Sequence, residues 1–553
     1  MSDQPTYIRR WSLEEASGFV TGSGPLDGLS FAIKDNIDLL GVPTTAGDPR
    51  RTTPAASSAT AVQRLLAAGA APVGKTNLDQ YATGLVGTRS PYGACHSVYS
   101  PEHVSGGSSS GSAVAVASGE VDFALGTDTA GSGRVPAAFN GIVGLKPSRG
   151  LVPTTGVVPA CRSLDCVTVF SRTVRLAAQV LDVMAAYDAA DPFSRVVVQR
   201  GVPATPVVAV PRGDLGLSVE HRAAWEATVA EAADRFELVE VDVAPFLEAA
   251  RLLYEGPWVA ERQLAFGDVL DDDPAVDPTV RAIVAGAPPA TAVDAFRGLH
   301  RLAELDRATV PVWDLADALL LPVTPTHPTL AEVAADPVGA NSALGRFTNM
   351  TNLLDLCAIA FPGRARGDGL PFGVQLLAPA GGDRMLLALV AGWLGEPSPV
   401  PEDAAVEAAV EAAVEAAVGE ERMVVAVAGA HLAGQPLNAD LVARGGTFVE
   451  RTQTAPDYRM YLVDGPLPRP GLIRAPGSAG RTPAGTGLEV ELWSLPTARI
   501  GGFLATIAAP LGLGQVELAD GRVVTGFICG PDGVDPEREI TAHGGWRGWL
   551  ASR

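Results

Sequence analysis

The sequence is poor in positive charge and in long apolar runs. Lys plus Arg number 41 against 62 Asp plus Glu, so the formal net charge is 41 − 62 = −21 at pH 7. Phosphate backbones and anionic lipid surfaces are repelled by this balance, and no basic run offsets it, so we expect neither nucleic acid nor a membrane as a partner. No uncharged apolar run approaches the roughly 18 residues that a membrane-spanning helix needs.

Cysteine pairs and a leader segment are also missing. The five cysteines are odd in number and include no C-x-x-C pair, which argues against a disulfide framework and a zinc ribbon. We expect them to be reduced and packed in the interior. The N-terminal residues lack the basic start, apolar middle and small-residue cleavage site of a signal peptide, which predicts a cytoplasmic location.

What is present is an alternation of short apolar segments with helical ones. Residues 57–70 have apolar positions at helical spacing, and 221–236 are predicted to be a further helical stretch. Short apolar runs bounded by Gly, Pro or Asp predict strands, as in 121–128, 206–213 and 371–379. The alternation predicts an α/β layered fold.

The composition changes after Gly395. A Pro-rich stretch leads into AAVEAAVEAAVEAAVGEE, a four-residue repeat that we interpret as a helical spacer without catalytic role. From Met423 onward, strands with turn residues between them are predicted, with a short helix at 499–507. We therefore predict a catalytic domain over 1–396, a linker over 397–422 and a smaller α+β domain over 423–553.

Two short motifs resemble known sites but lack their context. GAAPVGKT (69–76) matches a phosphate loop, yet a helix ends at Gly69 and Pro72 lies inside the loop, so Lys75 is expected to end a strand beside the site instead. GSSSG (107–111) matches a nucleophile elbow centred on Ser109. The preceding SPEHVSG is turn-like, and His221, His300 and His327 carry no partner signature, which argues against that elbow.

Three segments carry the chemistry. Two Ser/Gly-rich stretches, 104–119 and 126–148, are each joined to apolar or rigid sequence, which is not typical of a linker. Glycines around a serine let consecutive N–H groups face a ligand, as in an oxyanion hole, although a tight turn is the plainer alternative. In FAIKDN, Lys34 follows an apolar run. Burial lowers a lysine pKa, and the neutral amine can act as a base toward a serine.

Together FAIKDN, GGSSSGSA and GTDTAGSGRVPAAFNGIVGLKPS resemble the amidase signature family, over roughly residues 24–395. The resemblance implies a central mixed β-sheet flanked by helices. It also implies a reaction that needs no metal or cofactor. It implies that Lys34 is the general base, Ser108 the bridging serine on a cis peptide, and Ser132 the nucleophile. The spacing 132 − 108 = 24 matches the family. The alternative is that these serines only cap helices.

The same resemblance assigns the oxyanion hole to the backbone amides of Thr129, Ala130, Gly131 and Ser132. One departure from the family pattern is Ser110, which replaces the first of two glycines after the paired serines. That change does not affect the triad assignment, but the family pattern no longer predicts the geometry of this turn.

The substrate is indicated by LLYEGPWVAERQ. Tyr254 and Arg262 lie eight residues apart, just over two turns if the segment is one helix, so both side chains are expected to point the same way. A surface position is the alternative for Arg262. The pair resembles the carboxylate clamp of allophanate hydrolases, for which an arginine fork is suited.

Segments after residue 423 resemble the C-terminal domain of allophanate hydrolases, a γ-glutamyl cyclotransferase-like fold. They include AGAHLAGQPLN, TAPDYRMYLV and GLEVELWSLP. The resemblance implies a second active site in which His431, at the end of a predicted strand, handles the product of the first; a structural histidine is the alternative. No cyclotransferase acid aligns near Glu489 and Glu491, so cyclotransferase activity is not predicted.

The implied reaction is hydrolysis of allophanate to ammonia and N-carboxycarbamate, followed by decarboxylation, with two ammonia and two carbon dioxide as the sum. The resemblance also implies a homodimer and a separate urea carboxylase that supplies the substrate. Alternatives are an amidase of broader small-amide specificity, a glutaminase subunit of an amidotransferase that needs a partner, and a binding protein with a degenerate triad.

Overall fold

The computed structural model describes residues 4–270, 273–286, 290–400, 422–463, 468–475 and 486–553. These residues form two compact units, divided within 401–421. The predicted repeat lies in that interval, outside the described residues, so the domain boundaries at 396 and 423 stay predictions. Each unit is described by itself.

An eleven-stranded sheet runs through the N-terminal unit, in the order β1-β3-β2-β6-β8-β7-β12-β13-β11-β9-β10. Its strands are β1 (Tyr7–Arg10), β2 (Ser30–Lys34), β3 (Ala71–Thr76), β6 (Phe123–Asp128), β7 (Val143–Lys146), β8 (Cys166–Ser171), β9 (Val207–Pro211), β10 (Glu237–Val241), β11 (Ala318–Pro322), β12 (Leu356–Pro362) and β13 (Gly373–Pro379). β2 pairs in parallel with both β3 and β6, whereas β12 is antiparallel to both of its neighbours. The sheet is mixed, as predicted.

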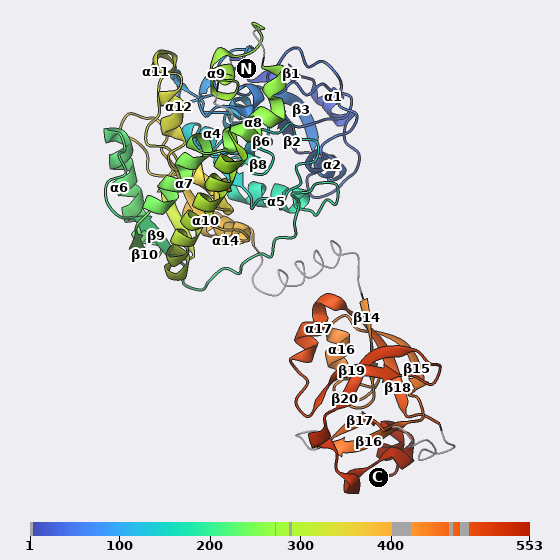
Figure 1. Cartoon of the computed structure of the whole chain (residues 1–553). Helices are drawn as coiled ribbons and strands as arrows, with labels where there is room; N and C mark the ends of the chain where they lie inside the picture. Colours follow the sequence, from blue (N-terminus) through green and yellow to red (C-terminus); the bar gives the residue numbers. More distant parts are fainter. Residues whose placement is uncertain (1–3, 271–272, 287–289, 401–421, 464–467, 476–485) are drawn as a thin grey trace. The chain divides into compact units, whose positions relative to one another are not determined.

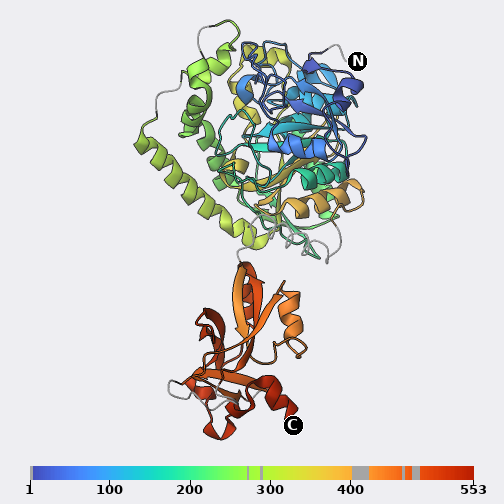
Figure 2. The same ribbon diagram turned by 90° about the vertical axis from the view of Figure 1, so that its right-hand side faces the viewer.

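Helices cover both faces of this sheet (Figures 1 and 2). Phe31 and Ile33 of β2 pack into the core beneath α2 (Thr60–Ala67), α5 (Val174–Met184) and α14 (Asp383–Leu394). Ala32 between them faces the core beneath α3 (Ser110–Ala117) and α4 (Val135–Phe139). Both faces of the strand are thus buried, which is why its sequence is a continuous apolar run rather than an alternating one. The predicted α/β class is confirmed.

The helices of this unit are α1 (Leu13–Ser17), α2 (Thr60–Ala67), α3 (Ser110–Ala117), α4 (Val135–Phe139), α5 (Val174–Met184), α6 (Val219–Ala233), α7 (Ala244–Glu255), α8 (Trp258–Phe266), α9 (Pro278–Val284), α10 (Ala292–Leu315), α11 (Leu330–Ala335), α12 (Gly339–Leu344), α13 (Met350–Leu353) and α14 (Asp383–Leu394). Two further strands, β4 (His96–Ser97) and β5 (Ser100–Val104), form a separate ribbon. The segment SPEHV, predicted to be a turn, is therefore a strand.

A five-stranded sheet in the order β15-β18-β14-β20-β19 forms the C-terminal unit, beside a two-stranded β16-β17 ribbon. The strands are β14 (Arg422–Val427), β15 (Thr447–Gln453), β16 (Tyr458–Val463), β17 (Arg469–Arg474), β18 (Glu489–Pro496), β19 (Leu511–Glu517) and β20 (Val523–Cys529), and the helices are α16 (Asn438–Ala443), α17 (Thr497–Leu504) and α18 (Trp546–Ala551). The predicted α+β character of this smaller unit is confirmed.

Among the described residues no helix combines the length and apolar character needed to cross a bilayer. The chain contains 38 arginines but only three lysines. Lys34, Lys75 and Lys146 are each at most 1% exposed. All three therefore lie inside the N-terminal unit.

Candidate active site

Lys34 lies at the carboxyl end of β2, and Thr127 lies near the carboxyl end of the parallel neighbour β6. Parallel neighbours end at the same edge of a sheet, where ligands commonly bind in α/β folds. The Lys34 side chain is fully buried there. Its Nζ donates to Ser108 Oγ at 2.7 Å and to Thr127 Oγ1 at 2.8 Å.

The electrostatics around Lys34 favour the neutral amine near neutral pH. Burial lowers the pKa of Lys34 to about 7, although Asp79, Asp165 and Asp128 act in the opposite direction. A lysine with a pKa of about 7 is neutral in a large fraction of molecules at pH 7. It can therefore accept a proton from a hydroxyl group.

Ser108 precedes helix α3, and the peptide bond between Gly107 and Ser108 is cis, as the family resemblance implies. The carbonyl oxygen of Ser108 accepts a hydrogen bond from Asp79 N at 3.0 Å. The Asp79 carboxylate in turn accepts the amides of Gly87 at 3.0 Å and Arg89 at 2.9 Å. Burial raises the pKa of Asp79. This buried network fixes the segment that carries Ser108.

Ser132 lies in the loop between β6 and α4. Its Oγ donates to Gly84 O at 3.5 Å, and within the described chain no hydrogen bond joins it to Ser108. A relay through Ser108 therefore requires the Ser132 hydroxyl to turn away from Gly84. The fold brings Lys34 and Ser108 together, whereas the contact between the two serines stays a prediction.

Asp128 holds the loop that carries Ser132. Its carboxylate accepts Gly131 N at 2.8 Å and Gly133 N at 3.0 Å, and it pairs with Arg134 through two hydrogen bonds of 2.9 and 3.0 Å. Burial acts to raise the pKa of Asp128, but Arg134 keeps it below the ordinary value. Asp128 thus remains charged and keeps the loop rigid.

This arrangement corrects one part of the predicted oxyanion hole. The Gly131 amide donates to Asp128, so it is not available to an oxyanion in this conformation. The amides of Thr129, Ala130 and Ser132 donate to no other described group and stay candidates. Gly131 has φ of 134°, and a Cβ there would lie 2.4 Å from Thr348 Oγ1, so glycine is needed for the turn rather than for its N–H.

Tyr254 and Arg262 lie on two helices rather than one. Tyr254 is near the end of α7, Gly256 and Pro257 break the chain, and Arg262 belongs to α8. The predicted proximity nevertheless holds, because the Arg262 guanidinium carbon is 5.6 Å from the centroid of the Tyr254 ring. Two short helices that meet at a bend bring the side chains together, in place of the predicted two turns of one helix.

Arg262 is a buried cation with spare donors. It is 1% exposed, its Nη1 donates to Thr83 Oγ1 at 3.1 Å, and its Nε has no hydrogen-bond partner among the described residues. No ion pair joins it to a described carboxylate. Thr83 precedes Gly84, whose carbonyl receives Ser132 Oγ. The spare guanidinium donors therefore lie close to the nucleophile candidate.

The two rejected motifs have structural roles. Lys75 lies within β3 and forms a buried ion pair of 2.7 Å with Asp35. Ser109 is the residue before α3, and its Oγ bonds to the backbone of Thr127 at 3.3 and 3.4 Å. None of the histidines that were considered as its partners hydrogen-bonds to it; His327 Nε2, for instance, contacts Val104 O at 2.9 Å. The elbow is rejected by these contacts, although a strand does precede it.

In the C-terminal unit His431 lies in the turn after β14, four residues beyond the end of that strand at Val427, rather than at a strand end as predicted. Its ring stacks on Phe527 at 5.1 Å and meets Phe503 edge-on at 5.3 Å. Burial lowers the pKa of His431 to about 4, so the ring is neutral at pH 7. It lines a small cavity together with Arg469.

Glu491 is fully buried behind this turn. It accepts the Ala433 amide at 2.7 Å and pairs with Arg547 at 2.8 Å, and Arg547 also donates to Ala433 O at 2.8 Å. Burial acts to raise the pKa of Glu491, but Ala433 and Arg547 hold it below the ordinary value. A carboxylate held charged in this way supports the turn and is not placed to donate a proton as a cyclotransferase acid does.

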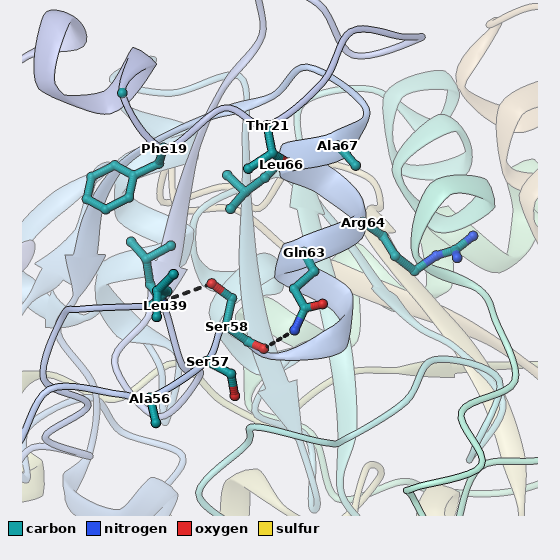
Figure 3. A pocket seen from close by; sticks show the side chains of 12 residues that line it. Phe19, Thr21, Leu39, Ala56, Ser57, Ser58, Gln63, Arg64, Leu66 and Ala67 are labelled. Atoms are coloured by element: carbon teal, nitrogen blue, oxygen red, sulfur yellow. Dashed lines mark hydrogen bonds between the residues drawn. The ribbon is translucent and has the colours of Figure 1, made fainter.

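A larger cavity of about 680 Å³ lies elsewhere in the N-terminal unit, beside α2 (Figure 3). Figure 3 shows Phe19, Leu39 and Ser58 grouped around it, with Arg64 extending away. Arg64 Nε donates to Val183 O at 2.6 Å. None of the triad candidates lines this cavity. Its size alone therefore does not mark the site of chemistry.

Two family models match the sequence. The model described as Amidase matches residues 11–387, and the one described as the allophanate hydrolase C-terminal domain matches residues 423–551. The chain belongs to the amidase family. The predicted family, with its two-part organisation, is confirmed.

Relatives match both units or only the first. A urea amidolyase of Saccharomyces cerevisiae is 39% identical over 95% of this chain, which spans 30% of that relative's length. A glutamyl-tRNA(Gln) amidotransferase subunit from a Synechococcus species is 36% identical over 68% of this chain and 85% of its own length. The solved structure of Kluyveromyces lactis allophanate hydrolase is 36% identical with a TM-score of 0.69, and the match covers 100% of this chain and 94% of that one.

Several residues around the site were missed from the sequence. Thr127, Asp79, Asp128 and Thr83 all contact a predicted site residue or its loop. Thr127 and Asp128 belong to the quoted GTDTAGSGR string, where a polar pair at the end of an apolar strand was an available signal. Asp79 and Thr83 lie in no motif, and only the fold brings them to the site.

Proposed function

We propose that the N-terminal unit hydrolyses the amide of allophanate to ammonia and N-carboxycarbamate. The observation that carries this proposal is the buried Arg262 guanidinium, which forms no ion pair with a described carboxylate, near a Lys34–Ser108 pair whose amine has a pKa of about 7. An amide that carries a carboxylate fits a site with one base and one spare cation. Relatives described as urea amidolyase and allophanate hydrolase support the same substrate.

In this proposal Ser132 attacks the amide carbonyl while its proton passes through Ser108 to neutral Lys34. The amides of Thr129, Ala130 and Ser132 stabilise the oxyanion. The proton returns to the departing nitrogen, ammonia leaves, and water hydrolyses the acyl-enzyme. Arg262 binds the carboxylate through its free donors, and Tyr254 packs against the guanidinium.

The C-terminal unit then promotes decarboxylation of N-carboxycarbamate at the cavity lined by His431. The bond between nitrogen and one carboxyl carbon breaks, its electron pair remains on nitrogen, and a proton is taken up, which leaves carbamate and carbon dioxide. Carbamate takes up a further proton and falls apart into ammonia and carbon dioxide. The sum is two ammonia and two carbon dioxide per allophanate. Homodimerisation and coupling to a urea carboxylase are parts of the same proposal.

The test of the first step is ammonia release from freshly prepared allophanate by the full chain and by Ser132→Ala. We expect the variant to lose activity by at least about 10³-fold. Ser109→Ala, a matched change of the neighbouring buried serine, is expected to retain most of it. A serine-directed fluorophosphonate should label Ser132 alone. Full activity of Ser132→Ala would exclude the mechanism.

The substrate assignment is tested separately with Arg262→Ala. We expect kcat/KM for allophanate to fall about 10- to 100-fold, while turnover of the uncharged acetamide or benzamide changes little, because only allophanate presents a carboxylate. Malonamate should behave like allophanate in this test. An equal fall for charged and uncharged amides would leave the amidase chemistry standing and remove the clamp.

A second candidate function is glutamine hydrolysis, favoured by the 36% identity to an amidotransferase subunit. Glutamine also carries a carboxylate and an amide, but more atoms separate them than in allophanate. Turnover of glutamine in preference to allophanate, dependent on an added partner, would favour this reading. A general preference for simple amides would favour a broader amidase.

A further inference from the structure

The small cavity of the C-terminal unit is mostly apolar but contains one unsatisfied cation. Leu437, Pro470, Ile507 and Phe527 line it, together with His431, Thr506 and Arg469. The space open to the centre of a water molecule is about 40 Å³. A single water needs roughly 10–15 Å³ on that measure, so the cavity suits a ligand of a few heavy atoms and excludes a nucleotide or peptide.

Arg469 is half-buried and differs from six other arginines of this unit. The arginines that form ion pairs with described carboxylates are Arg444, Arg451, Arg459, Arg474, Arg522 and Arg547. The Arg469 guanidinium, by contrast, makes no ion pair or hydrogen bond to a described group, and its Nε is buried without a partner. A buried donor without an acceptor costs free energy, and an anionic ligand removes that cost.

The fold brings Arg469 to the turn that carries His431. Arg469 opens β17, and the next residue, Pro470, packs against Gly429 of that turn. A Cβ on Gly429 would lie 2.3 Å from Pro470 Cδ, so glycine allows the strand to approach this closely. The turn itself is held from behind by Glu491 and Arg547. The packing of β17 against this turn therefore brings the side chains of Arg469 and His431 to one cavity.

His431 does not supply the positive charge of this cavity. Its ring is neutral at pH 7, and neither ring nitrogen hydrogen-bonds to a described group. Thr506 Oγ1 uses its proton on Phe503 O at 2.7 Å. Among the described lining residues Arg469 is thus the cation, and His431 is left with a free donor and a free acceptor.

We propose that Arg469 binds a carboxylate in this cavity, which makes it a site for a small dicarboxylate with His431 at its wall. One carboxylate accepts from the Arg469 fork, and the group beyond it meets the imidazole. The identification of the ligand as N-carboxycarbamate rests on the proposed function. The anion site itself rests on the cavity and the unpartnered guanidinium.

The direct test uses malonate, in which a methylene replaces the nitrogen of N-carboxycarbamate. Binding is measured by calorimetry on the full chain with Arg262→Ala, so that the first candidate site does not contribute. Adding Arg469→Ala should weaken binding by about 10- to 100-fold, and Arg469→Lys should weaken it less, because charge remains but the fork is lost. Arg474→Ala, a change on the same strand at an ion-paired arginine outside the cavity, should leave binding unchanged.

A second readout follows the product of the first reaction with ¹³C-labelled allophanate. In Arg469→Ala with Arg262 intact, the first ammonia should be released at the parent rate, which also shows that the chain is folded, while N-carboxycarbamate decays only at its enzyme-free rate. Malonate affinity that is absent in the parent, or equal in Arg469→Ala and Arg474→Ala, would overturn the anion site. If the parent does not turn over allophanate but malonate binding depends on Arg469, the proposed function fails and the anion site stands.

Discussion

In the N-terminal unit Lys34 is fully buried among hydroxyl and carboxyl groups, whereas in the C-terminal unit His431 is partly exposed beside two phenylalanine rings. At the first site burial lowers the pKa of Lys34, while three nearby carboxylates act to raise it and two hydroxyl groups hold the amine in place. At the second, the ring nitrogens of His431 and the guanidinium of Arg469 make no hydrogen bond to a described group. Under our proposals the first site is preorganised for chemistry on a neutral amide, whereas the second is completed by a charged ligand.

The largest effect that separates the sites is expected for Lys34→Met. Ammonia release should fall by about 10²- to 10⁴-fold, because the general base is lost. Stability should rise at the same time: an ordinary lysine pKa of 10.5 falls to about 7 on burial, which is worth up to about 5 kcal/mol. Denaturant unfolding at pH 7 measures this gain.

The expected gain in stability of Lys34→Met can be checked by measuring unfolding as a function of pH and by substituting a second buried lysine. Between pH 7 and 10.5 the unfolded chain binds more protons at Lys34 than the folded one, so this contribution makes the parent more stable as pH rises, and the variant lacks that dependence. Lys75→Met instead breaks an ion pair with Asp35 and should cost about 3–5 kcal/mol. A loss of stability in both variants would contradict the assigned burial cost.

The next effect compares the carboxylates that hold the two site loops. Asp128→Asn leaves the fully buried Arg134 with a weakened partner, so the free energy of unfolding should fall by about 3–5 kcal/mol. Ammonia release should fall as well. Glu491→Gln faces Arg547, whose side chain is 25% exposed, so about 1–2 kcal/mol is expected, with the first ammonia unaffected. Unfolding curves and ammonia assays on both variants measure this. Equal losses of ammonia release would mean that the units do not act separately.

The rates of the two steps should also depend differently on pH, with a smaller effect than that of the substitutions above. Ammonia release should fall by about tenfold per pH unit below pH 7, because Lys34 then becomes protonated. Removal of N-carboxycarbamate, measured against its enzyme-free decay, should not follow His431 until about pH 4, where that ring takes up a proton. A first step that is flat from pH 5 to 7 would argue against Lys34 as the base.

The smallest effect is expected for Ser110→Gly, which restores the usual family pattern. Ser110 is the first residue of α3, and its Oγ makes a long 3.4 Å hydrogen bond to Asn77 O. Activity should stay within about twofold and stability should fall by at most about 1 kcal/mol. A large change in kcat would show that this turn, unlike the loop around Asp128, tunes the nucleophile segment.

Much of the fold was predictable because its signals are local. Strand β11 is an uninterrupted apolar run, β6 and β13 contain shorter apolar runs between turn residues, and helix α2 follows the 3.6-residue period. SPEHV was missed because β5 is a short, partly exposed strand whose Pro and polar residues carry no such signal. The eight-residue spacing of Tyr254 and Arg262 predicts one helix, but Gly256 and Pro257 between them end α7 and start a new one.

The candidate site was predictable only in its motif residues. Lys34 and Ser108 are 108 − 34 = 74 positions apart, and only their family pattern linked them before the structure joined them. The amide of Gly131 was assigned to the oxyanion hole because a motif does not say which N–H is already used by Asp128. Arg469 belongs to no motif, and its significance comes from the partner that it lacks.

The burial of all three lysines has a consequence for chemical labelling. Surface charge of positive sign is carried by arginine, so acylating reagents directed at amines find no exposed lysine on this chain. Lys75 is held in an ion pair and Lys146 donates to Pro147 O. A reagent small enough to enter the site therefore meets in Lys34 one nucleophilic amine with a pKa of about 7, and a single acyl group there would report directly on the state of the base.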